Sequence, residues 1–133
     1  MRLLSVTGWS NSGKTTLIVA LIKHCVARGE RVAAIKHTHH EVSDRNEGDT
    51  ARFLEAGASI AILTNDDEAI LWRTGASPVP IPPWTWTGEG ACPPLDADVI
   101  FIEGFKSRHG WPRIEAPAEL AEAIAILDRI APP

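Results

Sequence analysis

Hydrophobic residues recur along the chain with two periods, and the alternation of these periods predicts an α/β fold. Short apolar runs typical of strands are separated by segments whose apolar residues return every three or four positions, as on one face of a helix. The strand-like runs cover residues 2–7, 31–35, 59–63 and 98–103, and the helical patterns cover residues 14–28, 49–56 and 119–130. Strand, helix and strand in this order predict parallel βαβ units with a right-handed crossover.

Three other segments show weaker patterns. Residues 68–73 follow a polar turn and are expected to pair back on the preceding strand as a hairpin, and residues 112–115 predict a further short strand. Residues 75–97 hold more than half of the ten prolines, a density that excludes a central strand or helix. This long loop carries Trp84 and Trp86, which are expected to fold back on the domain's own core or to meet a partner surface or a base.

The segment at residues 8–15 reads G-x-x-x-x-G-K-T, the phosphate-binding loop of P-loop nucleoside triphosphatases. A predicted strand precedes it and a predicted helix follows it, which is the context that the motif requires. Gly8 and Gly13 allow a tight turn that points backbone N–H groups at one anion, at the positive end of the helix. Lys14 is expected to contact the β- and γ-phosphates, and the Thr15 hydroxyl to bind Mg²⁺. The motif therefore predicts nucleotide binding.

A polar cluster follows directly on the strand predicted over residues 31–35. It consists of Lys36, His37, Thr38, His39 and His40. Ligands of parallel sheets bind outside the carboxyl ends of the strands, so these side chains are expected to face the phosphates, Mg²⁺ or a transition metal. The alternative is a polar loop whose histidines form hydrogen bonds within a turn.

Three acidic residues are candidates for the Mg²⁺ side of the site. Asp98 begins and Glu103 ends the apolar strand over residues 98–103. The carboxyl end of this strand shares an edge with the P-loop, so Glu103 is predicted to act on Mg²⁺ through a water, and Asp98 to be solvated at the opposite end. Asp49 has two interpretations: it caps the helix over residues 49–56, or it lies near Mg²⁺.

Length and composition describe one ordinary globular domain over residues 1–133. The hydrophobic and charged contents of 44% and 23% are typical of soluble proteins. A net charge of −4 gives no basic surface for nucleic acid, and no apolar run is long enough to span a membrane. Cys25 and Cys92 form neither a disulfide framework nor a metal spacing. A reduced, cytoplasmic setting is expected, and a partner chain is expected to complete so short a domain.

Four segments match the motifs of one known family. They are residues 8–17 (GWSNSGKTTL), residues 32–40 (VAAIKHTHH), residues 48–52 with 56–58, and residues 99–106 (VIFIEGFK). Many families share the P-loop, whereas IKHTHH after the second strand combined with EGFK after the later strand is more specific. On these segments the chain resembles the molybdopterin-guanine dinucleotide biosynthesis protein B (MobB) family.

The resemblance implies a P-loop three-layer sandwich that binds GTP with Mg²⁺ and hydrolyses it weakly. It implies a homodimeric adapter that assists the guanylyltransferase of molybdenum cofactor biosynthesis, with molybdopterin as a possible further ligand. The implied nucleotide-binding residues are Gly8, Trp9, Ser10, Asn11, Ser12, Gly13, Lys14, Thr15, Thr16, Lys36, His37, His39 and His40. The implied Mg²⁺ ligands are Thr15, Asp49 and Glu103, and the catalytic roles fall to Lys14 and Glu103.

The chain departs from the family in its shortened tail, residues 107–133, and in the proline- and tryptophan-rich loop. Two other functions are weighed against the adapter. A metal-insertion GTPase is favoured by the histidines but would need cysteine ligands at metal spacing. A small-molecule kinase would need an arginine-bearing lid, and no arginine lies between Arg73 and Arg108. No arginine or glutamine stands out as a transition-state group, so fast hydrolysis is not predicted.

Overall fold

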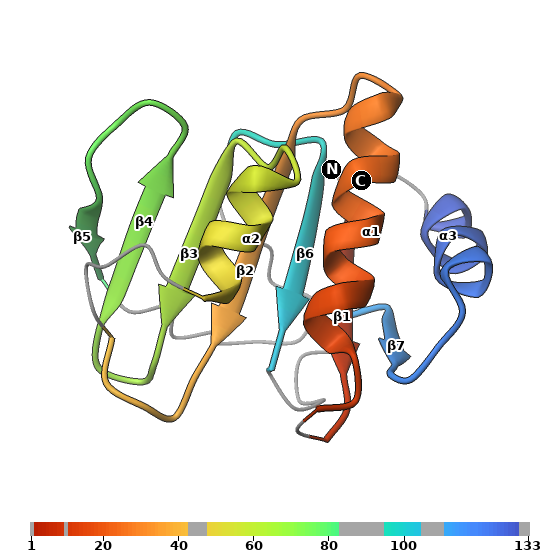
Figure 1. Cartoon of the computed structure of the whole chain (residues 1–133), viewed down its shortest axis with the longest axis horizontal. Coiled ribbons are helices and arrows are strands. Elements are labelled where there is room, and N and C mark those ends of the chain that lie inside the picture. The colour runs from red at the N-terminus through yellow and green to blue at the C-terminus, as the bar shows by residue number, and fades with distance from the viewer. Residues whose placement is uncertain (1, 10, 43–47, 83–94, 105–110, 131–133) are drawn as a thin grey trace.

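The computed structural model describes residues 2–9, 11–42, 48–82, 95–104 and 111–130 (Figure 1). In chain order, its elements are β1 (Arg2–Thr7), α1 (Lys14–Ala27), β2 (Val32–His37), α2 (Asp49–Glu55), β3 (Ile60–Thr64), β4 (Ala69–Arg73), β5 (Val79–Ile81), β6 (Val99–Glu103), β7 (Arg113–Glu115) and α3 (Leu120–Arg129). Every strand and helix expected from the hydrophobic pattern is present, with ends that differ by one or two residues.

The strands form one seven-stranded sheet in the order β5-β4-β3-β2-β6-β1-β7. Strands β3, β2, β6, β1 and β7 are parallel to one another, whereas β4 pairs antiparallel with β3 and β5 antiparallel with β4. The predicted α/β fold with a mostly parallel sheet is confirmed. Because β6 lies between β1 and β2, the P-loop after β1 and the polar cluster at the end of β2 lie on either side of Glu103.

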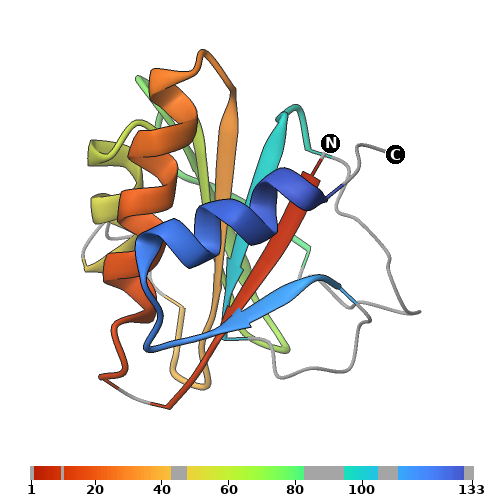
Figure 2. The same cartoon turned by 90° about the vertical axis from the view of Figure 1, so that its right-hand side faces the viewer.

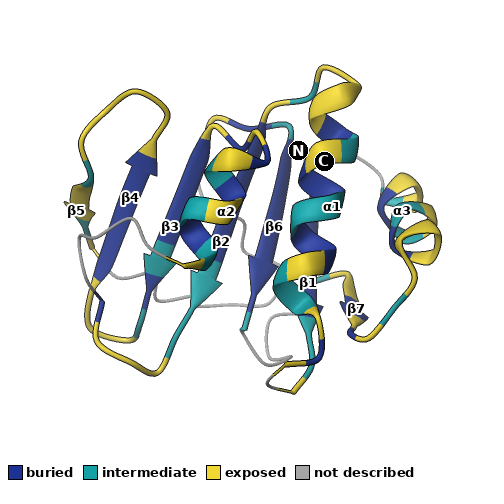
Figure 3. Ribbon diagram, in the orientation of Figure 1, coloured by how far each residue is buried: buried dark blue, intermediate teal, exposed yellow. Residues whose placement is uncertain are grey.

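The helices pack on one face of the sheet. Helices α1 and α2 cover the middle strands, and α3 packs beside α1 next to β1 (Figures 1 and 2). Alternate strand residues meet the buried stripe of α1 in a single cluster, which is dark blue in Figure 3. Its largest fully buried members include Leu4, Phe101, Phe53, Ile18, Leu21, Ile22 and Leu127. Burial of each such side chain contributes roughly 1.5–3 kcal/mol to folding.

The opposite face of the sheet is apolar as well. It presents Ile35, Ile62, Ile100 and Ile102, all fully buried, and the partly buried Leu95 and Trp111 pack against this cluster among others. Among the residues that the structure describes, no helix covers this face, so a helical third layer is not seen there. The predicted Trp84 and Trp86 loop lies outside the described residues, apart from its two ends.

Three local expectations differ from the structure. The second strand continues past Ile35 through Lys36 and His37, because both residues pair with β3 and Lys36 also pairs with β6. Part of the proline-rich segment forms β5, a short edge strand containing Pro80, and edge strands are where proline is tolerated. The spacing of Leu120, Ile124, Leu127 and Ile130 in the last helix predicts one packed face, but Leu120 is exposed.

Candidate functional site

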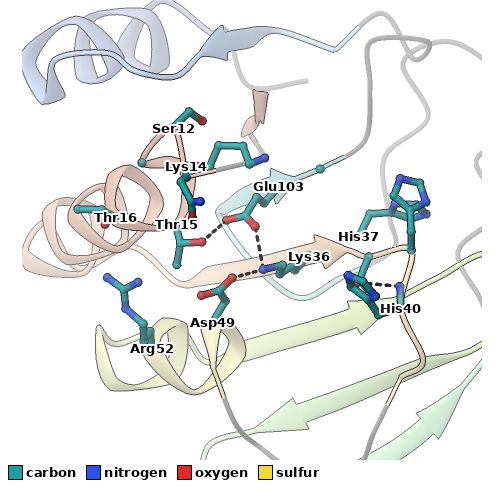
Figure 4. A pocket seen from close by; sticks show the side chains of 15 residues that line it. Ser12, Lys14, Thr15, Thr16, Lys36, His37, His40, Asp49, Arg52 and Glu103 are labelled. Carbon is teal, nitrogen blue, oxygen red and sulfur yellow. Dashed lines mark hydrogen bonds and ion pairs between the residues drawn. The ribbon is translucent and has the colours of Figure 1, made fainter. Parts of the chain in front are cut away.

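A cavity of about 590 Å³ opens at the carboxyl ends of β1, β2 and β6 (Figure 4). The start of α1, the end of β2, the first turn of α2 and the end of β6 all contribute to it. Its lining residues are Asn11, Ser12, Gly13, Lys14, Thr15, Thr16, Lys36, His37, Thr38, His39, His40, Asp49, Arg52, Glu103 and Gly104. Most of the site residues predicted from the sequence therefore surround one cavity.

The P-loop has the backbone that its glycines are expected to provide. Gly8 has φ 147° and Gly13 has φ 89°, and Asn11 also adopts a positive φ of 62°. A side chain at Gly8 would come within 2.9 Å of the Ala116 carbonyl oxygen and 2.6 Å of the Ser12 hydroxyl, so no other residue fits there without a shift. Ser10 lies outside the described residues.

The N-terminus of α1 has the features of an anion-binding site. Gly13 is the N-cap and provides no side-chain cap, and the first turn of α1, all of it described, carries no acidic residue. The first N–H groups of a helix have no acceptor within the helix and lie at its positive end. Lys14 Nζ donates to the Gly8 carbonyl at 2.9 Å, so the ammonium group lies within the loop that it is predicted to serve. Phosphate oxygens are the ligands that such a loop accepts.

Two predicted Mg²⁺ groups are already in contact. Thr15 Oγ1 donates to Glu103 Oε1 at 2.6 Å, which joins the first turn of α1 to the end of β6. Glu103 has only 3% of its side chain exposed. Asp98, its competitor at the other end of the strand region, accepts hydrogen bonds from Arg31 instead, far from the P-loop edge. The predicted separation of the two acids is therefore seen in their positions.

Lys36 links the remaining acids. Its Nζ donates to Asp49 Oδ2 and lies 3.3 Å from Glu103 Oε2 (Figure 4). Burial alone would lower the pKa of Lys36, but the hydrogen bond to Asp49 and the charges of Glu103 and Asp49 outweigh it and raise the pKa above its usual value. The ammonium group is therefore charged at neutral pH. Asp49 is the first residue of α2, whose N-cap is Gly48, so the capping interpretation of Asp49 is wrong.

The donor set at this edge fits Mg²⁺. Thr15 offers a hydroxyl oxygen, and Asp49 and Glu103 offer carboxylates, the hard oxygen ligands that Mg²⁺ prefers. Mg²⁺ in phosphate-transfer sites usually binds one or two carboxylates and completes its shell with phosphates and water. Within the described ranges, no group of three or more histidine, cysteine or acidic side chains is arranged to hold a metal ion. The residues present therefore fit a metal that arrives with phosphates.

The rings of His37 and His39 are in contact, and the His40 backbone is held separately. Because side chains alternate along a strand, Lys36 faces α1 and α2 whereas His37 points to the other face of the sheet. The ring of His37 lies 3.2 Å from Asp66 and meets the ring of His39 edge-on, with centroids 5.2 Å apart. The His40 backbone is held by hydrogen bonds with Thr38 and Asn65. His37 and His39 also line a second cavity of about 200 Å³.

The second cavity adjoins the larger one, and the two share Lys14, His37, His39 and Gly104. Trp9, with 64% of its surface exposed, and Gly8 line it together with Lys14 and Gly104. Neither Gly8 nor Trp9 lines the larger cavity. These two predicted binding residues therefore line the adjoining cavity and not the larger one.

Sequence reasoning missed one residue of the site, Arg52. Arg52 lines the larger cavity from α2, and within the described part of the chain its guanidinium forms no hydrogen bond or ion pair (Figure 4). The signal was its spacing: a residue three positions after Asp49 lies on the same side of a helix. Thr38 and Gly104 line the cavity as well.

Comparison with known proteins gives the family. A family model described as "Molybdopterin guanine dinucleotide synthesis protein B" matches residues 3–127. The chain belongs to the MobB family. It is 39% identical over 105 residues to the molybdopterin-guanine dinucleotide biosynthesis adapter protein of Haemophilus influenzae, an alignment that covers 78% of this chain and 57% of that protein. The resemblance stated from the motifs is therefore confirmed.

Two further relatives carry similar descriptions. A putative molybdopterin-guanine dinucleotide biosynthesis adapter protein of Methanocaldococcus jannaschii is 34% identical over 107 residues, covering 80% of this chain and 42% of that protein. The crystal structure of Bacillus subtilis MobB aligns over 94% of this chain and 73% of that chain, with 21% identity and a TM-score of 0.48. The chain spans about half the length of the curated relatives it matches.

No described helix of this MobB-family chain is both long and apolar enough to cross a membrane.

Proposed function

We propose that this chain is a nucleotide-binding adapter in the biosynthesis of molybdopterin guanine dinucleotide. It would bind GTP with Mg²⁺ and assist a separate guanylyltransferase that joins GMP to molybdopterin. The contact between Thr15 and Glu103 carries the proposal, because it brings the P-loop and the acid of β6 together at an anion-binding helix start. Membership of the MobB family and the adapter descriptions of its relatives support the biological role.

The residues divide into three tasks in this proposal. The N–H groups of the P-loop, from Gly8 to Thr16, and the ammonium of Lys14 would hold the phosphates. The Thr15 hydroxyl, Asp49 and Glu103 would hold Mg²⁺, which would neutralise phosphate charge. Lys36 and the loop from His37 to His40 would line the phosphate end of the cavity. Guanine preference is supported by family membership, since no guanine-reading motif occurs in the sequence.

Any hydrolysis of GTP at this site would be slow. Lys14 would stabilise charge on the phosphates, and Glu103 would act through Mg²⁺ and its waters. None of the described residues of the cavity is a glutamine that could orient an attacking water, as in fast GTPases. We therefore propose weak hydrolysis at most. A homodimer, a cytoplasmic setting and a contact with molybdopterin belong to the same proposal and rest on the family resemblance.

A metal-insertion GTPase is the alternative function that the histidines favour. The described residues lend it little support, because no three histidine, cysteine or acidic side chains among them are arranged to hold a metal ion. The kinase alternative gains Arg52 as a phosphate-side cation, but Arg52 lies on α2 and not on a lid.

Calorimetric titration of the purified chain with GTP and ATP, each with Mg²⁺, tests the binding step. GTP should bind more tightly than ATP, and Lys14→Ala should abolish binding, whereas Lys23→Ala, an exposed lysine of the same helix, should change nothing. The adapter role is tested by the rate of GMP transfer to molybdopterin by the transferase, with and without the chain. Unchanged transfer, tight Ni²⁺ or Zn²⁺ binding without nucleotide, or a preference for ATP would each count against the proposal.

A further inference from the structure

Three charged side chains meet at the inner end of the larger cavity. The ammonium group of Lys36 contacts the Asp49 carboxylate and lies 3.3 Å from Glu103 Oε2. Thr15 donates to the other oxygen of Glu103 at 2.6 Å. Figure 4 shows this chain of contacts running from α1 through β6 and β2 to α2. Both oxygens of Glu103 therefore have a donor nearby.

The contact with Lys36 stabilises the buried carboxylate of Glu103. With 3% of its side chain exposed, the Glu103 carboxylate has little access to solvent and needs a compensating charge. Lys36 supplies that charge, and it does so from the adjacent strand, because Lys36 and Glu103 are direct partners in the β2–β6 register. Asp49 comes from a separate element, so its contact with Lys36 also ties the start of α2 to the sheet.

In the proposed function, Mg²⁺ is held by the Thr15 hydroxyl and by the carboxylates of Asp49 and Glu103. Lys36 therefore contacts the same two carboxylates that Mg²⁺ would need. An ammonium group and a divalent cation cannot share one pair of carboxylates, because the two positive charges would lie close together and repel each other. Only one of the two can hold Asp49 and Glu103 at a time. Lys36 has 28% of its side chain exposed and lines the same cavity as Lys14 and the start of α1. Its flexible stem therefore allows the ammonium group to turn towards bound phosphates while β2 stays in place.

We propose that Lys36 is the resident cation of this site, which holds Asp49 and Glu103 until nucleotide and Mg²⁺ arrive together. Lys36 then leaves the two carboxylates and pairs with a terminal phosphate oxygen. The charges favour this exchange only when phosphates are present, because Mg²⁺ alone would displace the ammonium group without offering it a new anion. Lys36 thereby makes Mg²⁺ binding depend on nucleotide. The inference rests on the proposed function for the identity of both ligands.

Calorimetric titration with Mg²⁺ in the absence of nucleotide tests the inference. The wild type should bind Mg²⁺ weakly, whereas Lys36→Met and Lys36→Gln should each bind it at least about tenfold more tightly, because the competing cation is gone. Lys36→Arg keeps the charge and should resemble the wild type, and Lys23→Met is the control for loss of an exposed lysine. Adding Asp49→Asn to Lys36→Met should remove the gain, which would locate the Mg²⁺ at these carboxylates.

The binding of nucleotide supplies the second measurement. In the wild type, a non-hydrolysable GTP analogue and Mg²⁺ should each raise the affinity of the other, and this coupling should shrink in Lys36→Met. The inference is overturned if the wild type binds Mg²⁺ equally well with and without the analogue, a result that needs no variant. It is also overturned if folded Lys36→Met and Lys36→Gln bind Mg²⁺ alone no better than the wild type. If the wild type binds neither GTP nor ATP, the proposed function fails instead.

Discussion

Thr15 and Glu103, 88 residues apart in the sequence, are joined by a hydrogen bond of 2.6 Å from the threonine hydroxyl to the buried carboxylate. The bond connects the first turn of α1 to the end of β6. It is possible because β6 is inserted between β1 and β2, so that its last residue emerges beside the P-loop. Strand order, more than any local motif, therefore decides which acid serves the site.

Replacing Glu103 with glutamine should separate metal binding from nucleotide binding. The amide keeps the shape of the side chain but loses the charge, so the affinity for GTP in the presence of Mg²⁺ should fall about 10- to 100-fold. In the presence of EDTA, the wild type and Glu103→Gln should bind GTP alike. Asp98→Asn is the matched control, because Asp98 flanks the other end of the strand and pairs with Arg31. A similar loss in Asp98→Asn would contradict the assignment.

Replacing Gly104 with alanine should strain the edge of the sheet at the site. Gly104 has φ 95°, and an added Cβ would lie 2.7 Å from the backbone carbonyl oxygen of His37. The strained φ and the clash together should lower the free energy of unfolding by about 2–4 kcal/mol, as measured by chemical denaturation.

Gly75→Ala is the control for the strained backbone alone. Gly75 has φ 78°, but an added Cβ meets no atom within 4 Å, so the cost should be only about 1 kcal/mol. Equal losses in the two variants would show that the contact with His37 is not what requires glycine after β6.

Arg52 is expected to bind phosphate. Its guanidinium lines the cavity from α2, has no anion among its described neighbours, and lies on the side of α2 that carries Asp49 (Figure 4). Arg52→Ala should weaken GTP binding by about 1–2 kcal/mol, or roughly tenfold in Kd, and Arg52→Lys should recover part of it. Arg73→Ala, an exposed arginine at the opposite end of the sheet, should leave Kd unchanged. GDP and GMP titrations would show which phosphate Arg52 contacts.

The sequence predicted the sheet and the P-loop well because both depend on local signals. Apolar runs identify buried parallel strands, and G-x-x-x-x-G-K-T identifies the loop with its strand and helix. Glu103 was separable from Asp98 by the rule that ligands bind at the carboxyl ends of parallel strands.

The environment of Lys36 and the histidines was less predictable because it depends on register. The apolar run ends at Ile35, so Lys36 to His40 read as one polar cluster facing the ligand. Pairing with Glu103 and Thr64 extends β2 by two residues, and the alternation of the strand then sends Lys36 and His37 to opposite faces. The sequence left two roles open for Asp49, helix capping and metal binding. Its contact with Lys36 depends on how α2 packs on β2, which no local pattern indicates.

The thiol of Cys25 should make stability depend on alkaline pH. Burial in α1, and to a smaller extent the nearby charge of Glu30, raises the pKa of Cys25 from 9.0 to about 11. Below pH 9 the thiol is neutral in both folded and unfolded chains and has no effect. Between pH 9 and 11 only the unfolded chain ionises, so the free energy of unfolding falls as pH rises, by on the order of 2 kcal/mol.

The free energy of unfolding of the wild type and of Cys25→Ala, measured at pH 7.5 and 10.5, isolates this effect. The alanine variant should be less stable at pH 7.5, because it leaves a small cavity in the fully buried helix face. That difference should shrink or reverse at pH 10.5, since only the wild type pays for keeping a buried thiol neutral. All other groups are the same in the two proteins, so their effects cancel. A difference that stays constant across this range would mean that Cys25 ionises equally easily in the folded and unfolded chains.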